Sequence, residues 1–183
     1  MLKRIFPALW VGLFLISCST NKKQDTEGRT HPRELTETEK QIDAVISKAT
    51  FQDLNGETVS IEDFAGKVIL IDFWETWCGP CLQVFPAMDS LLTEYPNDFA
   101  VLAVNTQQSD EPSDVEQFAN ENPYQMNVLL DVNEIGNQVI TLGIPFKVFV
   151  DPDGYLIKAE LGSAGTEGDY LKAKEIIESY KKS

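Results

Sequence analysis

The pattern of apolar and polar positions divides this 183-residue chain into an apolar start, a polar stretch and a series of alternating strand-like and helix-like segments. The run from Val68 to Phe73 is apolar except for Asp72, and runs of this kind are typical of a central strand that is buried on both faces. The same pattern predicts further strands at 99–104, 127–130, 146–150 and 155–161.

Apolar residues recur at helical spacing between these strands. A helix is expected from Cys78 to about Glu94, with a kink at Pro86, because proline lacks the backbone N–H that a helix interior needs. Before the first strand, Thr36 and Glu39 fit a capping box for a short helix that either docks on the domain or forms an amphipathic spacer. The other predicted helices span 110–121, 132–142 and 169–182.

Two turn motifs complete the pattern. Asn55-Gly56 predicts a hairpin between residues 51–54 and 58–61, and Asp151 to Gly154 predicts a second hairpin between the last two strands. Alternating strands and helices imply parallel pairing, whereas the late hairpin implies an antiparallel edge. We therefore expect an α/β fold in which helices flank a central mixed sheet, with an added N-terminal β-hairpin.

The N-terminal residues 1–18 have the pattern of an export signal, because a basic start precedes a short apolar run. The run ends in Leu15-Ile16-Ser17-Cys18, which resembles the lipobox of bacterial lipoproteins and implies a lipid on Cys18. An uncleaved anchor and an ordinary secretory signal are the alternatives, and each places the domain outside the cytoplasm. Residues 19–49 are interpreted as a polar tether with the short helix, His31 as a solvated tether residue, and residues 50–183 as the domain.

The charge and the composition exclude several classes of function. The formal net charge of −14 argues against nucleic-acid binding, which needs a basic face. A single histidine leaves a histidine-based metal site almost without ligands, and a zinc site would need a second pair of ligands beside the cysteines. No metal or other cofactor is expected.

Cys78 and Cys81 are separated by Gly79 and Pro80 at the point where a strand ends and a helix begins, and such a pair can form a disulfide or a dithiol. The N-terminus of a helix favours an anion, and the thiolate is the attacking species. Cys81 is expected to be more buried and to resolve a mixed disulfide. Asp72 is expected to have a raised pKa and to exchange a proton with Cys81, unless it is a solvated acid at the strand end.

Three further positions lie close to the cysteines in the sequence. We expect Glu75 to be an exposed loop acid, with tuning of the thiol pair as the alternative. We expect Trp77 to shield the sulfur and offer surface to a partner, and Trp74 to belong to the core.

Gly143-Ile144-Pro145 precedes a strand, and the sequence leaves the isomer of the proline bond open.

The stretch Phe73-Trp-Glu-Thr-Trp-Cys-Gly-Pro-Cys81 resembles the active-site pattern of the thioredoxin superfamily. Asp72 falls on its buried acid and Ile144-Pro145 on its cis-proline loop. The early hairpin, Gly66-Lys67 and the Asp151-Pro-Asp-Gly turn are similar to the TlpA-like branch of membrane-tethered envelope thiol–disulfide oxidoreductases, many of them lipoproteins. The resemblance spans about Thr50 to Lys182.

This resemblance implies that Cys78 forms the mixed disulfide and that the client backbone pairs with Ile144. The substrate-binding residues that it implies are Trp77, Gly79, Pro80, Ile144 and Pro145. Two positions depart from the family pattern: Phe146 stands where many relatives have threonine, and Ala103 where thioredoxins often place a lysine near the buried acid.

The expected function is that of a monomeric protein-disulfide reductase of the bacterial cell envelope. Its partners would be disulfide-containing client proteins, with apocytochrome c as one candidate, and a membrane electron donor that recharges it, because exported compartments are oxidising. An envelope oxidase or isomerase, a thiol-based copper-binding module and a peroxidase are the alternatives.

Overall fold

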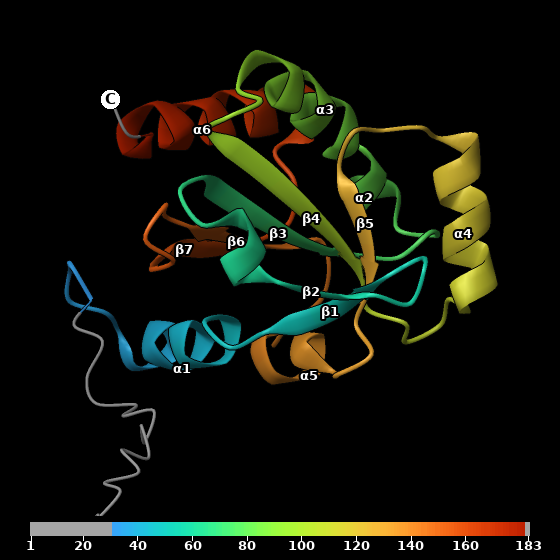
Figure 1. Cartoon of the computed structure of the whole chain (residues 1–183), viewed down its shortest axis with the longest axis horizontal. Coiled ribbons are helices and arrows are strands. Elements are labelled where there is room, and N and C mark those ends of the chain that lie inside the picture. Colours follow the sequence, from blue (N-terminus) through green and yellow to red (C-terminus); the bar gives the residue numbers. More distant parts are fainter. Residues whose placement is uncertain (1–30, 182–183) are drawn as a thin grey trace, which may run out of the picture. The chain divides into compact units, whose positions relative to one another are not determined.

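The computed structural model describes residues 31–181, which form a seven-stranded mixed sheet with helices on both faces (Figure 1). The predicted signal segment, Cys18 and the tether as far as residue 30 lie outside the described residues. The strands are β1 (Thr50–Asp53), β2 (Thr58–Ser60), β3 (Val68–Trp74), β4 (Phe99–Asn105), β5 (Asn127–Leu130), β6 (Phe146–Val150) and β7 (Leu156–Leu161). The helices are α1 (Glu37–Ile46), α2 (Gly79–Leu82), α3 (Phe85–Glu94), α4 (Pro112–Glu121), α5 (Ile135–Val139) and α6 (Gly165–Tyr180), and η1 (Ile61–Phe64) is a 3₁₀ turn.

The sheet has the strand order β2-β1-β5-β4-β3-β6-β7, so β3 lies in its interior. It pairs in parallel with β4 and antiparallel with β6, and all seven of its residues are buried. The N-terminal hairpin joins the sheet through β1, which runs antiparallel to β5. This arrangement confirms the expected α/β fold with its mixed sheet and added hairpin.

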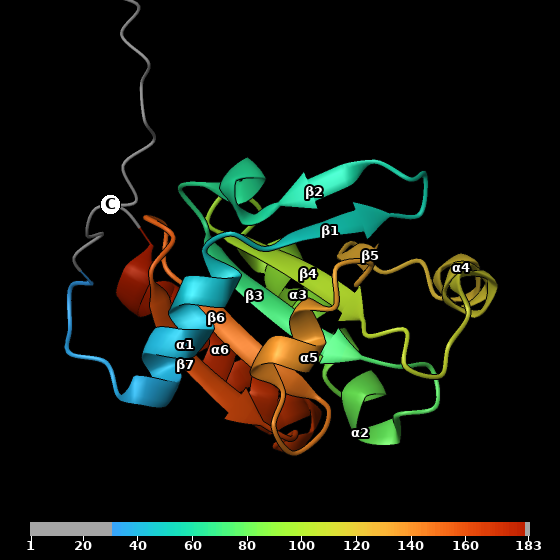
Figure 2. The ribbon, with the colours of Figure 1, turned by 90° about the horizontal axis from the view of Figure 1, so that it is seen from below.

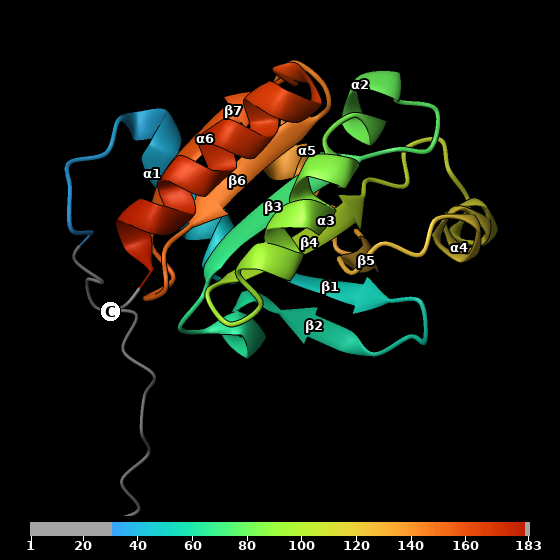
Figure 3. The same cartoon turned by 90° about the horizontal axis from the view of Figure 1, so that it is seen from above.

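Two helical layers cover the sheet: α3 and α6 lie on one face, and α1 and α5 on the other (Figures 2 and 3). Successive side chains of a strand point to opposite faces, which divides β3 between the layers. Leu70 and Trp74 belong to the core cluster with α3 and α6, whereas Ile71 and Phe73 belong to the cluster with α1 and α5. Asp72 shares the face of Leu70 and Trp74, where it lies in the layer that contains both cysteines of the CxxC motif.

The helix predicted before the first strand is α1, and it docks on the domain. Thr36 and Glu39 form the expected capping box, and Ile42 and Ile46 are buried in the core. The expectation that His31 is a solvated tether residue is wrong. Its ring is half-buried against Tyr155, with ring centroids 5.4 Å apart, and its Nε2 lies 2.8 Å from the Leu156 carbonyl oxygen.

The helix expected from Cys78 to Glu94 is two helices, α2 and α3, which meet at Gln83 and Val84. Pro86 is the second residue of α3, a position that needs no backbone N–H, so the predicted kink becomes a break. The helix expected over 132–142 is shorter, because Asp131 accepts hydrogen bonds from the backbone N–H groups of Ile135 and Gly136 and so begins α5 there. The last helix begins at Gly165 instead of Asp169.

Candidate active site

The helix α2 follows the carboxyl end of β3 (Figure 2). Cys78 caps the start of α2, and Cys81 lies within it. They form a disulfide, with their Cα atoms 5.3 Å apart. Cys78 is 3% exposed and Cys81 is fully buried, in the predicted order. The backbone N–H of Cys81 donates to the Sγ of Cys78 over 3.3 Å. Because α2 has only four residues, this N–H group is a more direct source of thiolate stabilisation than the dipole of a long helix.

Asp72 is fully buried, and the structure gives neither of its carboxylate oxygens a hydrogen-bond partner within residues 31–181. The pairing of the strands places it between Ala103 of β4 and Lys147 of β6. Burial raises the pKa of Asp72 well above its usual value; the positive charge of Lys147 opposes this shift and the charge of Asp169 adds to it. A carboxyl group with a raised pKa behind the cysteines can take up a proton and give it back, as general acid–base chemistry requires.

Lys147 is a charged residue of this layer that the sequence analysis missed. Its Nζ atom lies 2.5 Å from the carboxylate of Asp169 and 3.0 Å from that of Glu160, and its side chain is 2% exposed. A buried cation held between two acids keeps its charge, and the pKa of Lys147 is raised because these hydrogen bonds outweigh the cost of burial. The signal was present in the sequence as a single lysine inside the apolar strand 146–150.

Ile144-Pro145 is a cis peptide bond. Phe146 pairs with Phe73 across the sheet, so the loop before β6 lies beside the carboxyl end of β3, from which the CxxC motif follows. Ile144 is half-buried against the core cluster that contains both cysteines. Gly79 and Pro80 are exposed. The pairing of β3 with β6 brings the cis-proline loop and the CxxC motif to one end of the sheet.

The expectation that Glu75 is an exposed loop acid is wrong, because its side chain is 1% exposed. Its carboxylate accepts hydrogen bonds from the side chains of Thr106, Ser109 and Trp77 and from the backbone N–H groups of Gln108 and Ser109. Burial by itself would raise the pKa of Glu75, but these donors outweigh it, and the pKa is lowered. Trp74 is buried as expected, and Trp77 is 66% exposed.

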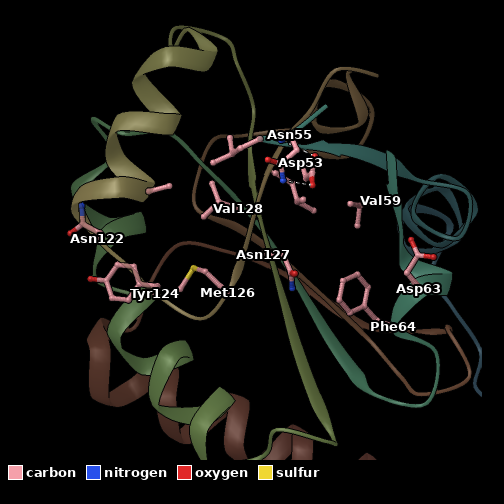
Figure 4. Close-up of a pocket in the computed structure, with 13 residues that line it drawn as sticks. Asp53, Asn55, Val59, Asp63, Phe64, Asn122, Tyr124, Met126, Asn127 and Val128 are labelled. Carbon is pink, nitrogen blue, oxygen red and sulfur yellow. Dashed lines mark hydrogen bonds between the residues drawn. The ribbon is translucent and has the colours of Figure 1, made fainter. Parts of the chain in front are cut away.

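A cavity of about 440 Å³ lies apart from the cysteines, between the β1–β2 hairpin, the end of α4 and β5 (Figure 4). Its lining mixes the apolar side chains of Val59, Phe64 and Met126 with polar ones such as Asn127. Within residues 31–181, no group of three or more histidine, cysteine, aspartate or glutamate side chains is placed to hold a metal ion. In the described part of the chain, no helix combines the length and apolar composition that crossing a bilayer requires.

Residues 42–162, which include the CxxC motif and the cis-proline loop, match the AhpC/TSA family. The chain belongs to this family. It is 33% identical over 115 residues to the thioredoxin-like protein YneN of Bacillus subtilis, covering 62% of this chain and 68% of YneN. It is 29% identical over 126 residues to the thiol-disulfide oxidoreductase ResA of Bacillus thuringiensis subsp. konkukian, covering 66% of this chain and 70% of ResA.

The fold also matches a solved structure from Chlorobium tepidum, assigned as the thiol:disulfide interchange protein DsbE. The TM-score is 0.61 at 26% identity, over 70% of this chain and 90% of that one. These matches confirm the resemblance to the thioredoxin superfamily. The protein is a thiol–disulfide oxidoreductase, and disulfide-containing proteins are its class of substrate.

Proposed function

We propose that this oxidoreductase reduces disulfide bonds in client proteins outside the cytoplasm through Cys78 and Cys81. The observation that carries the proposal is Asp72, a buried acid without a hydrogen-bond partner among the described residues, in the core layer of both cysteines. A buried unpaired carboxyl group costs free energy, and a role in proton transfer accounts for its presence.

The reaction is a pair of thiol–disulfide exchanges. The thiolate of Cys78, stabilised by the N–H of Cys81, attacks one sulfur of the client disulfide. That S–S bond breaks, a mixed disulfide forms, and the first client thiolate takes a proton from solvent. Asp72 then removes the proton of Cys81, whose thiolate attacks the Sγ of Cys78. The second client thiolate leaves and is protonated, so two electrons pass to the client and the Cys78–Cys81 disulfide remains.

The surface around Cys78 would bind the client. Gly79 and Pro80 are exposed, Trp77 presents its indole to solvent, and the cis-proline loop of Ile144 and Pro145 lies beside the end of β3. We propose that the client backbone pairs with that of Ile144 while its cysteine bonds to Cys78. Apocytochrome c is one candidate client.

The N-terminal residues support a location of the protein outside the cytoplasm. The reducing direction of the exchange requires a source of electrons for the Cys78–Cys81 disulfide. We propose that residues 1–18 are a lipoprotein signal peptide, that Cys18 carries the lipid, and that residues 19–49, whose helix α1 packs on the domain, connect the lipid to residues 50–183. We propose that the protein acts as a monomer in the cell envelope. Since that compartment is oxidising, a dithiol donor in the membrane would reduce the Cys78–Cys81 disulfide after each cycle.

The function is tested with the full chain and insulin as the disulfide substrate. Cys78→Ser should abolish insulin reduction, whereas Cys81→Ser should retain the first attack and accumulate a mixed disulfide. Retained turnover in Cys78→Ser would refute the assignment of Cys78 as the nucleophile.

The equilibrium redox potential of the Cys78–Cys81 pair tests the direction. A potential near or below about −250 mV supports a reductase, and one of about −120 to −180 mV would instead favour an oxidase or isomerase.

A further inference from the structure

Trp77 combines high exposure with a fixed side chain. Its indole is 66% exposed, yet its Nε1 lies 2.8 Å from the Glu75 carboxylate and 2.7 Å from the Ser109 hydroxyl. A tryptophan that only covered the sulfur would not need two acceptors on its single N–H. These contacts hold the indole in one orientation, next to Cys78 in the sequence.

The Glu75 carboxylate, which accepts from Trp77, is itself held in place by further donors. Five donors surround the Glu75 carboxylate, and apart from Trp77 they all belong to the segment that follows β4. The backbone N–H groups of Gln108 and Ser109 lie 2.7 and 3.3 Å from Oε1, and the hydroxyls of Thr106 and Ser109 complete the set. We call Glu75, Thr106, Gln108, Ser109 and Trp77 the Glu75 cluster.

A second carboxylate links the same two segments, but here the acceptor lies in the segment after β4 and the donors lie in the loop after β3. Asp110, at the end of the same segment, accepts hydrogen bonds from the backbone N–H of Thr76 over 2.6 Å and from its hydroxyl over 2.7 Å. The Asn105 amide also donates to Asp110 over 2.6 Å. The loop that carries Trp77 is therefore fixed to the segment after β4 at two successive residues.

We propose that the Glu75 cluster positions the Trp77 indole as a preformed contact for an apolar side chain beside the client's cysteine. Glu75 is thus a positioning residue that favours protein disulfides over small disulfides. This inference rests on the proposed reduction of client proteins. Ordering a large side chain on binding costs free energy, and in this structure the indole is ordered before the client arrives.

A purely electrostatic role for Glu75 makes a different prediction. A carboxylate three residues before Cys78 would disfavour its thiolate, and the rate would then change equally for every disulfide substrate. If Glu75 instead positions Trp77, removing its carboxylate changes the rate only for substrates that contact Trp77. The ratio of two rates separates the two roles.

The experiment compares the reduced full chain with its Glu75→Gln variant on two substrates, insulin and glutathione disulfide. We expect kcat/KM for insulin to fall roughly 2- to 13-fold, mainly through KM, and the glutathione disulfide rate to stay unchanged. Glu116→Gln removes an exposed carboxylate from α4 and is the matched control, expected to keep both rates. Ser109→Ala leaves the charge of Glu75 in place and should lower the insulin rate in the same direction.

A spectroscopic measurement tests the cluster independently of client reduction. The ¹⁵N–¹H cross-peak of the Trp77 indole, assigned with Trp77→Phe, should shift and broaden in Glu75→Gln. An unchanged cross-peak, an unchanged rate ratio, or an equal change for both substrates would overturn the inference. If the wild type failed to reduce insulin while the cross-peak still moved, the proposed function would fail and the positioning of the indole would stand.

Discussion

Asp72 and Glu75 are buried carboxylic acids three residues apart, at the end of β3 and in the loop that follows it. Asp72 lies in the core layer of the cysteines and finds no hydrogen-bond donor among the described residues, whereas five donors surround the Glu75 carboxylate. The pKa of Asp72 is raised chiefly by burial, and the pKa of Glu75 is lowered although burial opposes this.

The difference shows that burial alone does not decide the charge of an acid in this protein. Hydrogen-bond donors stabilise the ionised form, and their absence favours the protonated form. In the proposed reaction, Asp72 takes up the proton of Cys81 and returns it, which a raised pKa allows, whereas an ionised Glu75 is a fixed hydrogen-bond acceptor. The strand and the loop therefore supply two carboxyl groups of different kinds close to the cysteines in the sequence.

The comparison is tested most strongly by Asp72→Asn, which keeps the shape of the side chain and removes its ability to take up a proton. We expect the attack by Cys81 on the mixed disulfide to slow about 100-fold at pH 7, the lower end of the usual effect of general acid–base catalysis. Stopped-flow reaction of the full chain with dithiobis(nitrobenzoate) measures it, because the second thionitrobenzoate is released by Cys81. The first release, by Cys78, is the internal control, and an unchanged second release would remove Asp72 from the mechanism.

The same substitution should change how stability depends on pH. Because the folded pKa of Asp72 is raised, the folded state binds its proton more tightly, and stability falls as pH rises from the unfolded value of about 3.9 to the folded pKa. Relative to wild type, Asp72→Asn should therefore gain about 1.4 kcal/mol per pH unit in this window. Urea unfolding at a series of pH values measures the difference, and a constant difference would contradict it.

Glu75→Gln should show the opposite sign and a smaller effect. The folded pKa of Glu75 is lowered, so its contribution to stability is complete above the unfolded value of about 4.3 and is lost as pH falls through the folded pKa. We expect the variant to lose about 1 kcal/mol at pH 7, because an amide cannot accept from all five donors, and to lose less at acidic pH. The urea series above measures this too, with Glu116→Gln as the control; a deficit that grew on acidification would exclude an ionised Glu75.

Much of the sheet could be predicted because its signals are local. The continuous apolar run predicted β3, Asn55-Gly56 predicted the first hairpin, and Thr36 with Glu39 predicted the start of α1. Each of these patterns lies within a few residues, where spacing and turn chemistry decide the conformation. The cysteines, Asp72 and the cis-proline loop were found as a set because the family pattern joins them.

The remaining features depend on contacts that no local pattern contains. Four of the five donors to the Glu75 carboxylate follow it by 31 to 34 residues, and the carbonyl group that His31 contacts lies 125 residues away. His31 lies in a polar stretch, and Glu75 lies in the expected loop between a strand and a helix, so exposure was the natural expectation for both. Lys147 was missed for a related reason. The family pattern places a lysine near the buried acid at the position of Ala103, on β4, whereas in this protein the lysine beside Asp72 lies on β6, the other strand that pairs with β3.

The segment before β1 covers part of the edge strand β7, so the protein should be produced with this segment included. β7 is the last strand of the sheet, and the backbone of its first residues is occupied: Asp43 accepts from the N–H of Leu156, while the Arg33 guanidinium donates to the carbonyl of Ile157. A fragment beginning at Thr50 would leave these groups without those partners, on a strand edge open to a second molecule. Such a fragment would be prone to self-association, and its apparent oligomeric state would reflect the truncation.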